Sequence, residues 1–359
     1  MKILIFNPFG IGDVLFTTPL VRNVKESIKD ASISYLCNRR VYPLLKDNPV
    51  FDNVLIFEKD EWRETAKRSP IHFISKAFGF MREIKKMKFD VVFDLSMNSK
   101  YGFFLKTAGI KKRVGFNYKN RGGSLTHKID LPEGFKDRHV ARYNLDLSKF
   151  LDVSPKEYDF ELVLSETTLS KAKKILELSG IKAGEIPIVV CPGSGDSWGN
   201  TAYYKRWPAK YFLELCQKLQ SELNAFILIC GSKIENELCL YLHDNLSGKR
   251  INLCDKISLD EFVGIMSLSK LVITNDGGPF HLAQALSRPT VAFFGPVDEQ
   301  IYGAYPDKKN CEVLISDVNC RPCYRSFKFP PCPYDKLCLR KITPEIAFEA
   351  AAKKIIDRF

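Results

Sequence analysis

Apolar residues in this chain gather in short runs that alternate with longer segments of helical spacing. The runs are Lys2–Asn7, Ser32–Cys37, Asn53–Phe57, Val91–Leu95, Ile186–Cys191, Ala225–Cys230, Leu271–Thr274 and Thr290–Phe294. Helical patterns cover Ala209–Leu223 and Leu259–Met266 in the second half. Strands that alternate with helices indicate βαβ units around a parallel sheet. The pattern therefore predicts an α/β protein with two such series, one in each half.

The two series meet between residues 150 and 170. A strand-like Tyr158–Leu164 precedes a helical segment that starts at Thr168. We expect two Rossmann-like domains, parallel sheets flanked by helices, that face each other across a cleft. Their expected bounds are 1–165 and 166–359, the second with a Cys- and Pro-rich loop near 320–338 and a C-terminal helix. A length of 359 residues agrees with two domains.

Composition places the chain among folded proteins, with 45% hydrophobic and 27% charged residues. No apolar run approaches the ~18 residues that a membrane span requires. The first residues are interrupted too early for a secretory signal, so we expect a cytoplasmic protein. The eleven cysteines are an odd number spread over a long chain, which favours reduced thiols over a disulfide framework.

Charge is distributed unevenly along the chain. Residues 1–165 hold 29 Lys and Arg against 20 Asp and Glu, and the remainder holds 25 against 22. A basic first half suggests an anionic partner, either a phosphorylated substrate, an acidic membrane surface or nucleic acid. The alternative is that scattered lysines only solubilise the surface. No nucleic-acid recognition module is visible, which disfavours a nucleic-acid partner.

The first candidate site follows the first strand, in the run Gly10-Ile-Gly12-Asp13. Glycines allow a sharp turn and close approach to a ligand, and the next helix N-terminus favours an anion. The third glycine of a dinucleotide fingerprint is replaced by Leu15, and Arg39-Arg40 follows the second strand where an acidic residue is expected. An NADP-type oxidoreductase is therefore only an alternative. Asp13 is either a helix-capping residue or a functional carboxylate at the sheet edge.

Two further motifs follow strands of the second half. Gly193 and Ser194 lie in a turn that leads to Lys205-Arg206, a combination that can hold a diphosphate through backbone N–H groups and charge. The alternative is a solvated basic pair beside a core tryptophan. The run Asp276-Gly277-Gly278 precedes a helix that carries His281 in its first turn, so this N-terminus is a second candidate anion site.

Together these motifs resemble glycosyltransferase family 9, the ADP-heptose:lipopolysaccharide heptosyltransferases. The matching segments, in family order, are Gly12-Asp13 with Thr17 and Pro19, Arg113-Val-Gly115-Phe116, the Pro-Gly-Ser turn with Lys205-Arg206-Trp207-Pro208, Asn275-Asp276-Gly277-Gly278-Pro279 with His281, and Phe294-Gly295-Pro296. The resemblance implies a GT-B fold and an inverting, metal-independent transfer of a heptose-type sugar from a nucleotide diphosphate to a lipopolysaccharide-type saccharide. It implies no cofactor besides the nucleotide-sugar co-substrate.

The resemblance also implies roles for individual residues. Asp13 matches the family's general base, and Lys205 matches the lysine that faces the donor diphosphate. The other implied donor contacts are Gly193, Ser194, Asp276, Gly277, Gly278 and His281. The acceptor-side candidates are Gly12, Thr17, Arg113 and Arg121. The implied partners are an ADP-sugar, a lipid-linked oligosaccharide and, peripherally, an anionic membrane surface at the inner face of the cytoplasmic membrane.

Two features fit the resemblance less directly. Relatives often have an acidic residue just after the strand equivalent to Ala225–Cys230, where it can bond the nucleotide ribose. Here Glu235 stands several residues further on, so either it makes this contact from a shifted position or the ribose contact is absent. The assignment of the nucleotide as ADP is therefore the weaker part of the prediction. The cysteines Cys320, Cys323, Cys332 and Cys338 contain one Cys-x-x-Cys, which is half of a typical zinc site. We expect free thiols there, with a metal site as the alternative.

Overall fold

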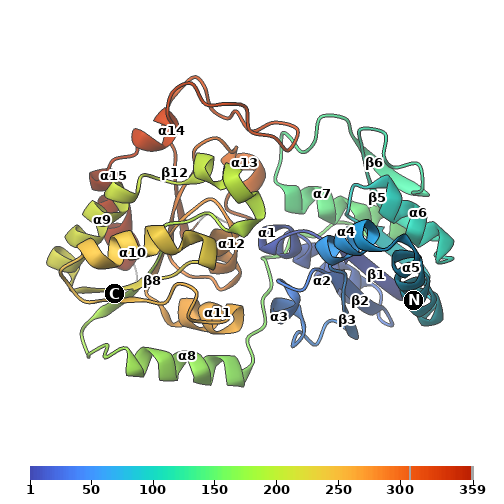
Figure 1. The fold of residues 1–359 in the computed structure, drawn as a ribbon, viewed down its shortest axis with the longest axis horizontal. Coiled ribbons are helices and arrows are strands. Elements are labelled where there is room, and N and C mark those ends of the chain that lie inside the picture. The colour runs from blue at the N-terminus through green and yellow to red at the C-terminus, as the bar shows by residue number, and fades with distance from the viewer. Residues whose placement is uncertain (307–308, 357–359) are drawn as a thin grey trace. The chain divides into compact units, whose positions relative to one another are not determined.

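The computed structural model describes residues 1–306 and 309–356, and the chain divides into two compact units (Figure 1). The N-terminal unit is Met1–Tyr158 and the C-terminal unit begins at Asp159. This division falls after residue 158, whereas the sequence suggested a boundary near residue 165. The N-terminal unit then holds 29 Lys and Arg against 18 Asp and Glu, so it carries nearly all of the net charge of +12.

The N-terminal unit is built on six parallel strands in the order β3-β2-β1-β4-β5-β6. The strands are β1 (Lys2–Asn7), β2 (Ser32–Cys37), β3 (Asn53–Ile56), β4 (Val91–Asp94), β5 (Lys112–Tyr118) and β6 (His127–Leu131). The helices are α1 (Ile11–Leu15), α2 (Thr18–Ser27), α3 (Tyr42–Leu45), α4 (Lys59–Arg68), α5 (Pro70–Met87), α6 (Ser99–Thr107) and α7 (Val140–Asp146), followed by the 3₁₀ turn η1 (Leu147–Leu151).

The C-terminal unit has six parallel strands in the order β12-β11-β10-β7-β8-β9. The strands are β7 (Ile186–Cys191), β8 (Ala225–Ile229), β9 (Arg250–Asn252), β10 (Leu271–Asn275), β11 (Thr290–Phe293) and β12 (Cys311–Leu314). The helices are α8 (Glu166–Leu178), α9 (Ala209–Leu223), α10 (Asn236–Asn245), α11 (Leu259–Leu268), α12 (Gly278–Ala285), α13 (Glu299–Tyr302), α14 (Leu337–Arg340) and α15 (Pro344–Ile356), with 3₁₀ turns η2 (Asp196–Lys205) and η3 (Lys233–Glu235).

Both sheets have the same topology. Counted from its own first strand, each sheet runs 3-2-1-4-5-6, which is the Rossmann order. The strand order reverses between β1 and β4 in one unit and between β7 and β10 in the other. Open α/β sheets bind ligands beyond the carboxyl ends of the strands at this reversal. The predicted fold class of two Rossmann-like parallel sheets is confirmed, and the topology defines one ligand-binding edge in each unit.

The predicted strands with continuous apolar runs agree with the structure to within a residue. β8 is buried at all five positions, as expected for a parallel strand covered on both faces. The predicted strand Tyr158–Leu164 is wrong, because that segment pairs with no other strand. Its apolar residue Phe160 instead stacks on Tyr305, with ring centroids 5.2 Å apart. The alternation of apolar and polar residues therefore reflects the burial of Phe160, and the backbone of this segment forms no strand hydrogen bonds.

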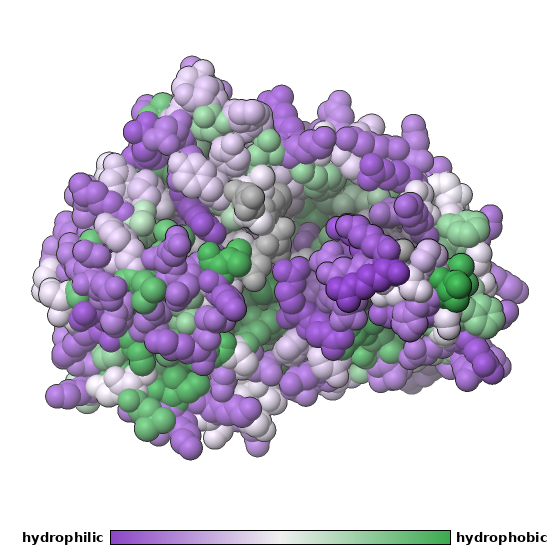
Figure 2. Space-filling model, in the orientation of Figure 1, coloured by the Kyte–Doolittle hydropathy of each residue, from purple (hydrophilic) through white to green (hydrophobic). Residues whose placement is uncertain are grey.

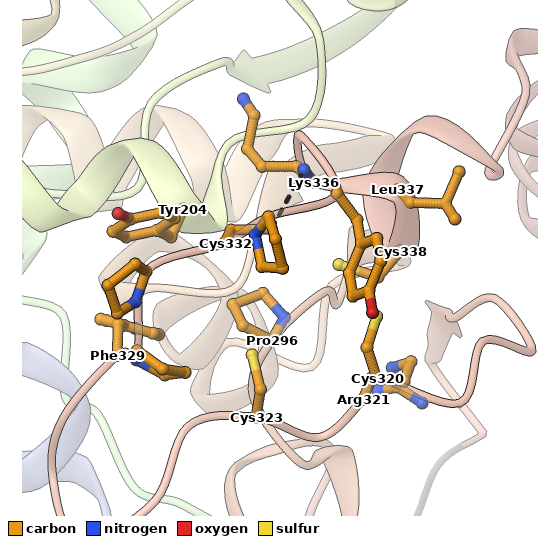
Figure 3. Close-up of a pocket in the computed structure, with 14 residues that line it drawn as sticks. Tyr204, Pro296, Cys320, Arg321, Cys323, Phe329, Cys332, Lys336, Leu337 and Cys338 are labelled. Atoms are coloured by element: carbon orange, nitrogen blue, oxygen red, sulfur yellow. Dashed lines mark hydrogen bonds between the residues drawn. The ribbon is translucent and has the colours of Figure 1, made fainter.

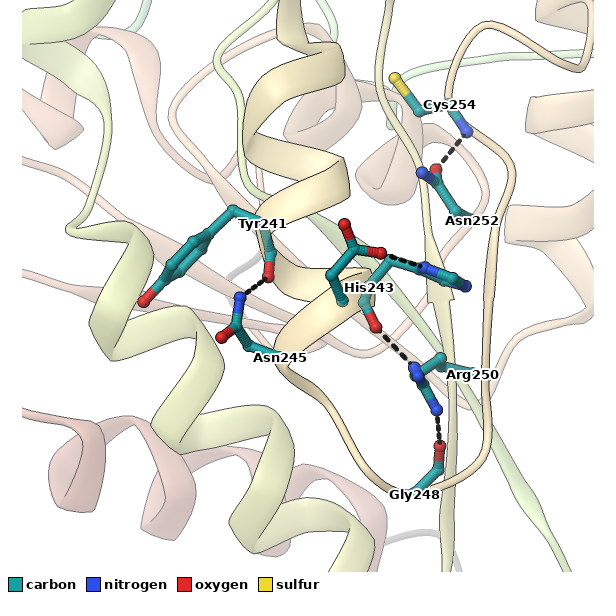
Figure 4. A network of polar contacts seen from close by, with 8 residues as sticks. Tyr241, His243, Asn245, Gly248, Arg250, Asn252 and Cys254 are labelled. Atoms are coloured by element: carbon teal, nitrogen blue, oxygen red, sulfur yellow. Dashed lines mark hydrogen bonds and ion pairs between the residues drawn. The ribbon is translucent and has the colours of Figure 1, made fainter.

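The sequence pattern missed four strands that are short or interrupted by polar residues: the interior strand β5 and the edge strands β6, β9 and β12. β9 has three residues, and its position is set by side chains around the end of α10 (Figure 4). Arg250 donates from Nε to the His243 carbonyl at 2.7 Å and from a terminal nitrogen to the Gly248 carbonyl at 3.0 Å. Asn252 accepts the Cys254 N–H at 3.0 Å. These bonds fix a strand that hydrophobic periodicity does not reveal.

Candidate functional site

The turn that follows β7 packs directly against the turn that follows β10. A Cβ atom added to Gly277 would lie 2.7 Å from the Ser194 carbonyl oxygen, so only glycine permits this approach. Asn275, at the end of β10, donates to the carbonyls of Pro192 and Gly193, both at 2.8 Å. The two loops that the sequence marked separately thus form one structure at the strand-order reversal of the C-terminal unit.

Asn275 also binds the segment that contains Lys205 and Arg206 to the same edge of the sheet. Its side-chain oxygen accepts the Trp207 N–H at 2.8 Å. The Trp207 ring is buried and stacks on Phe293 with centroids 4.0 Å apart. Lys205, two residues earlier, is therefore held in place by a core tryptophan and by the end of β10. The sequence singled out Lys205 but not Asn275, whose organising role depends on contacts between distant segments.

Lys205 forms a buried ion pair with Asp276. The distance from Nζ to Oδ2 is 2.8 Å, and both side chains are 4% exposed. Burial raises the pKa of the Asp276 carboxyl, and the neighbouring Lys205 partly opposes this. An ammonium has three N–H donors, and a buried ammonium of this kind is a strong partner for an anion. The structure thus places two predicted site residues in direct contact.

The remaining candidates of this unit surround the pair. Ser194 is buried and donates from its hydroxyl to the Ala202 carbonyl at 3.0 Å, which anchors η2. Helix α12 begins at Gly278, and Gly278 supplies the N–H at the helix end, because Pro279 has none and the Phe280 N–H donates to the Gly277 carbonyl at 3.1 Å. His281 is buried in this turn, edge-on to Phe280. Such a helix end, beside two glycine turns and a lysine, is suited to an anionic ligand.

Glu235 fixes the glycine turn that follows β7. One carboxylate oxygen accepts the Gly195 N–H at 2.8 Å, and the other accepts the Ser232 N–H at 2.9 Å and the Ser232 hydroxyl at 3.0 Å. A Cβ atom on Gly193 would lie 1.8 Å from the first oxygen. The sequence considered Glu235 only as a ribose contact, but these bonds show that it positions the turn.

In the N-terminal unit, Asp13 lies at the carboxyl edge of the sheet, in the first turn of α1. Its Oδ2 accepts the Gly10 N–H at 3.3 Å, so Gly10 is the capping position and Asp13 completes the turn from inside the helix. Asn7 donates to the Asp13 carbonyl at 3.0 Å and accepts the Phe9 N–H at 3.2 Å. Asp13 is exposed, and Gly12 beside it is partly exposed.

A second carboxylate stands at the same strand-order reversal. Asp94 ends β4, next to β1, and is buried. Burial raises its pKa to about 6, although Ser96 donates to it from both its hydroxyl, at 2.5 Å, and its N–H, at 3.1 Å. The sequence analysis did not single it out. The available signal was a carboxylate near the end of an otherwise apolar run, Val91–Leu95.

The acceptor-side candidates do not all gather at this edge. Thr17 is fully buried, and its hydroxyl donates to the Val14 carbonyl at 2.6 Å, so it supports the turn from inside the core. Arg113 lies at the start of β5, on the opposite edge, where its guanidinium donates to the carbonyls of Ser124, Ile110 and Lys111. Arg121 follows the end of β5, on the same edge as Asp13, and lies 5.8 Å from the Tyr118 ring centre.

The family model for glycosyltransferase family 9 (heptosyltransferase) matches residues 77–330. The chain belongs to glycosyltransferase family 9. It is 26% identical, over 98% of its length and 97% of the relative's, to lipooligosaccharide heptosyltransferase 2 of Campylobacter jejuni. The structure of a family 9 glycosyltransferase from Veillonella parvula matches with a TM-score of 0.80 at 21% identity, covering 99% of this chain and 97% of the other. An E. coli heptosyltransferase with ADP-2-deoxy-2-fluoro heptose matches with a TM-score of 0.70 at 18% identity, covering 98% and 99%.

Membership of family 9 makes this protein a glycosyltransferase with the GT-B combination of two Rossmann-like units. The predicted resemblance and enzyme class are therefore confirmed. Among the helices of the described residues, none is long and apolar enough to cross a bilayer.

The four C-terminal cysteines of this family 9 member line a common pocket in the C-terminal unit (Figure 3). Burial, followed by the neighbouring Cys320, Cys323 and Cys332, raises the pKa of the Cys338 thiol to about 11. All eleven cysteines are free thiols. Within the described part of the chain, no three His, Cys, Asp or Glu side chains form a group that could hold a metal ion.

Proposed function

We propose that the protein transfers a heptose from ADP-heptose to a lipopolysaccharide-type saccharide acceptor, with inversion at the anomeric carbon. The observation that carries the proposal is the buried Lys205–Asp276 pair beside the Gly193 and Gly277 turns. A cation beside a helix N-terminus at the reversal of a Rossmann sheet fits the diphosphate of a nucleotide sugar. The E. coli neighbour bound to an ADP-heptose analogue supports ADP as the nucleotide.

In this scheme Asp13 is the general base. The acceptor hydroxyl oxygen attacks the anomeric carbon and transfers its proton to Asp13, while the bond from that carbon to the phosphate oxygen breaks. Negative charge then develops on the departing ADP, where Lys205 and the N-terminus of α12 with its Gly278 N–H stabilise it. Asp276 fixes the direction of the Lys205 ammonium. One direct displacement inverts the configuration, requires a single base and routes no step through a metal ion or cofactor.

The basic edge of the N-terminal unit is the proposed site for an anionic acceptor. Arg39, Arg40 and Arg121 follow the carboxyl ends of strands, on the edge that carries Asp13. Arg39 is exposed and pairs with Glu61 at 3.2 Å. Phosphate groups on a lipid-linked saccharide would be attracted to such exposed cations. The cytoplasmic location and the contact with an anionic membrane surface belong to the same proposal.

The test is a direct assay of transfer. The purified chain is incubated with ADP-heptose, UDP- and GDP-sugars and a heptose-deficient lipopolysaccharide, and nucleotide release and the mass of the product are measured. We expect release of ADP and a product heavier by one heptose of inverted anomeric configuration. Absence of ADP binding by calorimetry, or transfer only from another nucleotide sugar, would contradict the donor assignment.

The acceptor site is tested with two matched charge reversals. Arg39→Glu with Arg40→Glu should raise the KM for the acceptor without changing ADP affinity. Lys111→Glu with Lys112→Glu makes the same change in charge at the opposite edge of the sheet, where β5 begins. Equal effects of the two pairs would indicate a general effect of net charge and would contradict the assignment of this edge.

A further inference from the structure

Helix α5 of the N-terminal unit has two apolar faces, and the fold uses one of them. On the inner face, Ile84 is buried, and Phe80, Met81 and Met87 pack against the core of this unit. On the outer face, Ile71, Ile74 and Phe78 are 82%, 64% and 67% exposed. Their spacing of three and four residues places them in one line along the helix. A packed helix needs only its inner face, so the outer apolar line requires another explanation.

The same outer line becomes basic toward the end of the helix. Arg82, Lys85 and Lys86 continue it and are exposed. Lys67 and Arg68 stand just before the helix, at the end of α4, and are also exposed. Residues 67–88 hold seven Lys and Arg against one acidic residue, Glu83. The apolar line is thus flanked by positive charge at both ends.

Helix α6 extends this surface. It lies beside α5, because Phe104 stacks on Phe80 with ring centroids 5.6 Å apart. Phe103 is 61% exposed, and Lys100 and Lys106, three residues to either side, are exposed as well. Apolar surface appears among hydrophilic surface in Figure 2 in the region where Figure 1 places α5.

We infer that the outer faces of α5 and α6 form a docking surface for an anionic lipid bilayer. Exposed aliphatic and aromatic side chains enter the boundary between headgroups and acyl chains, and flanking Lys and Arg bind anionic headgroups. Charge complementarity identifies the occupant, since a second copy of this basic unit would bring like charges together. The surface consists of helix faces, separate from the sheet edge that carries Asp13. The inference rests on the proposed lipid-linked acceptor, which must be reached at a membrane.

The experiment is co-sedimentation of the full chain with vesicles, in the absence of donor and acceptor. One set contains phosphatidylcholine alone and the other contains added phosphatidylglycerol. We expect binding to the anionic vesicles that weakens in high salt, because screening acts over ~8–10 Å at physiological ionic strength. The variant Ile74→Ser with Phe78→Ser should lower the affinity about tenfold or more, since it removes the inserting groups. Lys85→Glu with Lys86→Glu should abolish the preference for anionic lipid.

Matched controls come from α8 of the other unit. Leu178→Ser removes a side chain that is 79% exposed, and Lys173→Glu with Lys174→Glu reverses two exposed charges. Both controls should bind vesicles like the wild type. Equal losses in the α8 variants, or no vesicle binding by the wild type, would overturn the inference. A concentration-dependent dimer that the Ile74→Ser, Phe78→Ser variant abolishes would instead identify a second copy as the occupant.

Failure of this inference is distinguishable from failure of the proposed function. The α5 variants should keep wild-type ADP affinity and wild-type transfer to a detergent-dispersed acceptor, because none of the changed residues belongs to the sheet edges. They should lose transfer to an acceptor embedded in anionic vesicles. If the protein does not bind ADP, the co-sedimentation experiment still tests the docking surface, because that experiment contains no donor.

Discussion

The Nζ atom of Lys205 lies 2.8 Å from Oδ2 of Asp276, and both side chains are almost fully buried. The two residues are 71 positions apart, and they meet because η2 and the end of β10 converge on Asn275 and Trp207. Removing one charge of such a buried pair leaves the other without compensation, so a substitution at either residue tests the stability of the fold as well as the proposed donor contact.

Lys205→Ala is therefore expected to destabilise the fold as well as to weaken ADP binding. Breaking a buried pair by removing one partner typically costs about 3–5 kcal/mol in the free energy of unfolding. The control is Lys205→Ala combined with Asp276→Asn, which should recover much of the stability but not the ADP affinity. Denaturant unfolding and calorimetry measure the two effects. Unchanged ADP affinity in a folded Lys205→Ala protein would remove Lys205 from the donor site.

Asp13→Asn is expected to lower turnover about 10²–10⁴-fold, the range typical for loss of a positioned general base. ADP affinity should stay within a few-fold, because the base acts on the acceptor. Asn keeps an oxygen that can accept the Gly10 N–H, whereas Asp13→Ala also loses that bond. Turnover of the folded Asn variant at the wild-type rate would leave Asp13 with only its helix-capping role.

Gly193→Ala should disrupt the donor turn, since the new methyl group would collide with Glu235. We expect lower stability and weaker ADP binding, because Glu235 cannot move aside without losing its bonds to Gly195 and Ser232. Gly123→Ala is the matched control, because no atom lies within 4 Å of a Cβ there and its φ is not in the left-handed region. If Gly193→Ala binds ADP like the wild type, the turn does not hold the donor.

Asp94 should make stability depend on pH. Burial raises the pKa of the Asp94 carboxyl in the folded protein to about 6, above its usual value near 3.8. Because the protonated form is favoured in the fold, its stabilising contribution is present below pH ~4 and is lost as the pH rises through 6. The loss is about 3 kcal/mol by linkage. Asp94→Asn should remove this slope from unfolding free energies measured between pH 4 and 7, and an identical slope in the variant would contradict the assignment.

The reactivity of the eleven thiols should follow their exposure to solvent. Cys320, Cys323 and Cys332 are partly exposed and the other eight cysteines are buried. We expect three thiols to react with Ellman's reagent in the native protein and eleven in denaturant. Burial raises the pKa of Cys323, so this thiol should react more slowly than a free one. If all three thiols failed to react and a chelator made them reactive, a metal ion would be shown to bind them instead.

The sequence by itself determined the class of fold and the positions of most central strands. Runs such as Ala225–Cys230 are apolar at every position, which is typical of a parallel strand covered on both faces. It also marked the glycine turns and Lys205. Glycine permits a tight turn and lysine supplies a positive charge whatever segments surround them, so both can be recognised from the sequence. Its failure at Tyr158–Leu164 has the same origin, since local alternation does not reveal whether a partner strand exists.

Only the tertiary structure decided which marked residues act together. The parallel direction of the strands placed Arg113, at the start of β5, on the opposite edge from Asp13 and Arg121, although all three lie in one basic half of the sequence. Core packing turned Thr17 inward and brought Asn275, Glu235 and Asp94 to the site edges. The physical reason is that hydrogen-bond partners and burial are set by segments tens of residues apart, which local pattern does not encode.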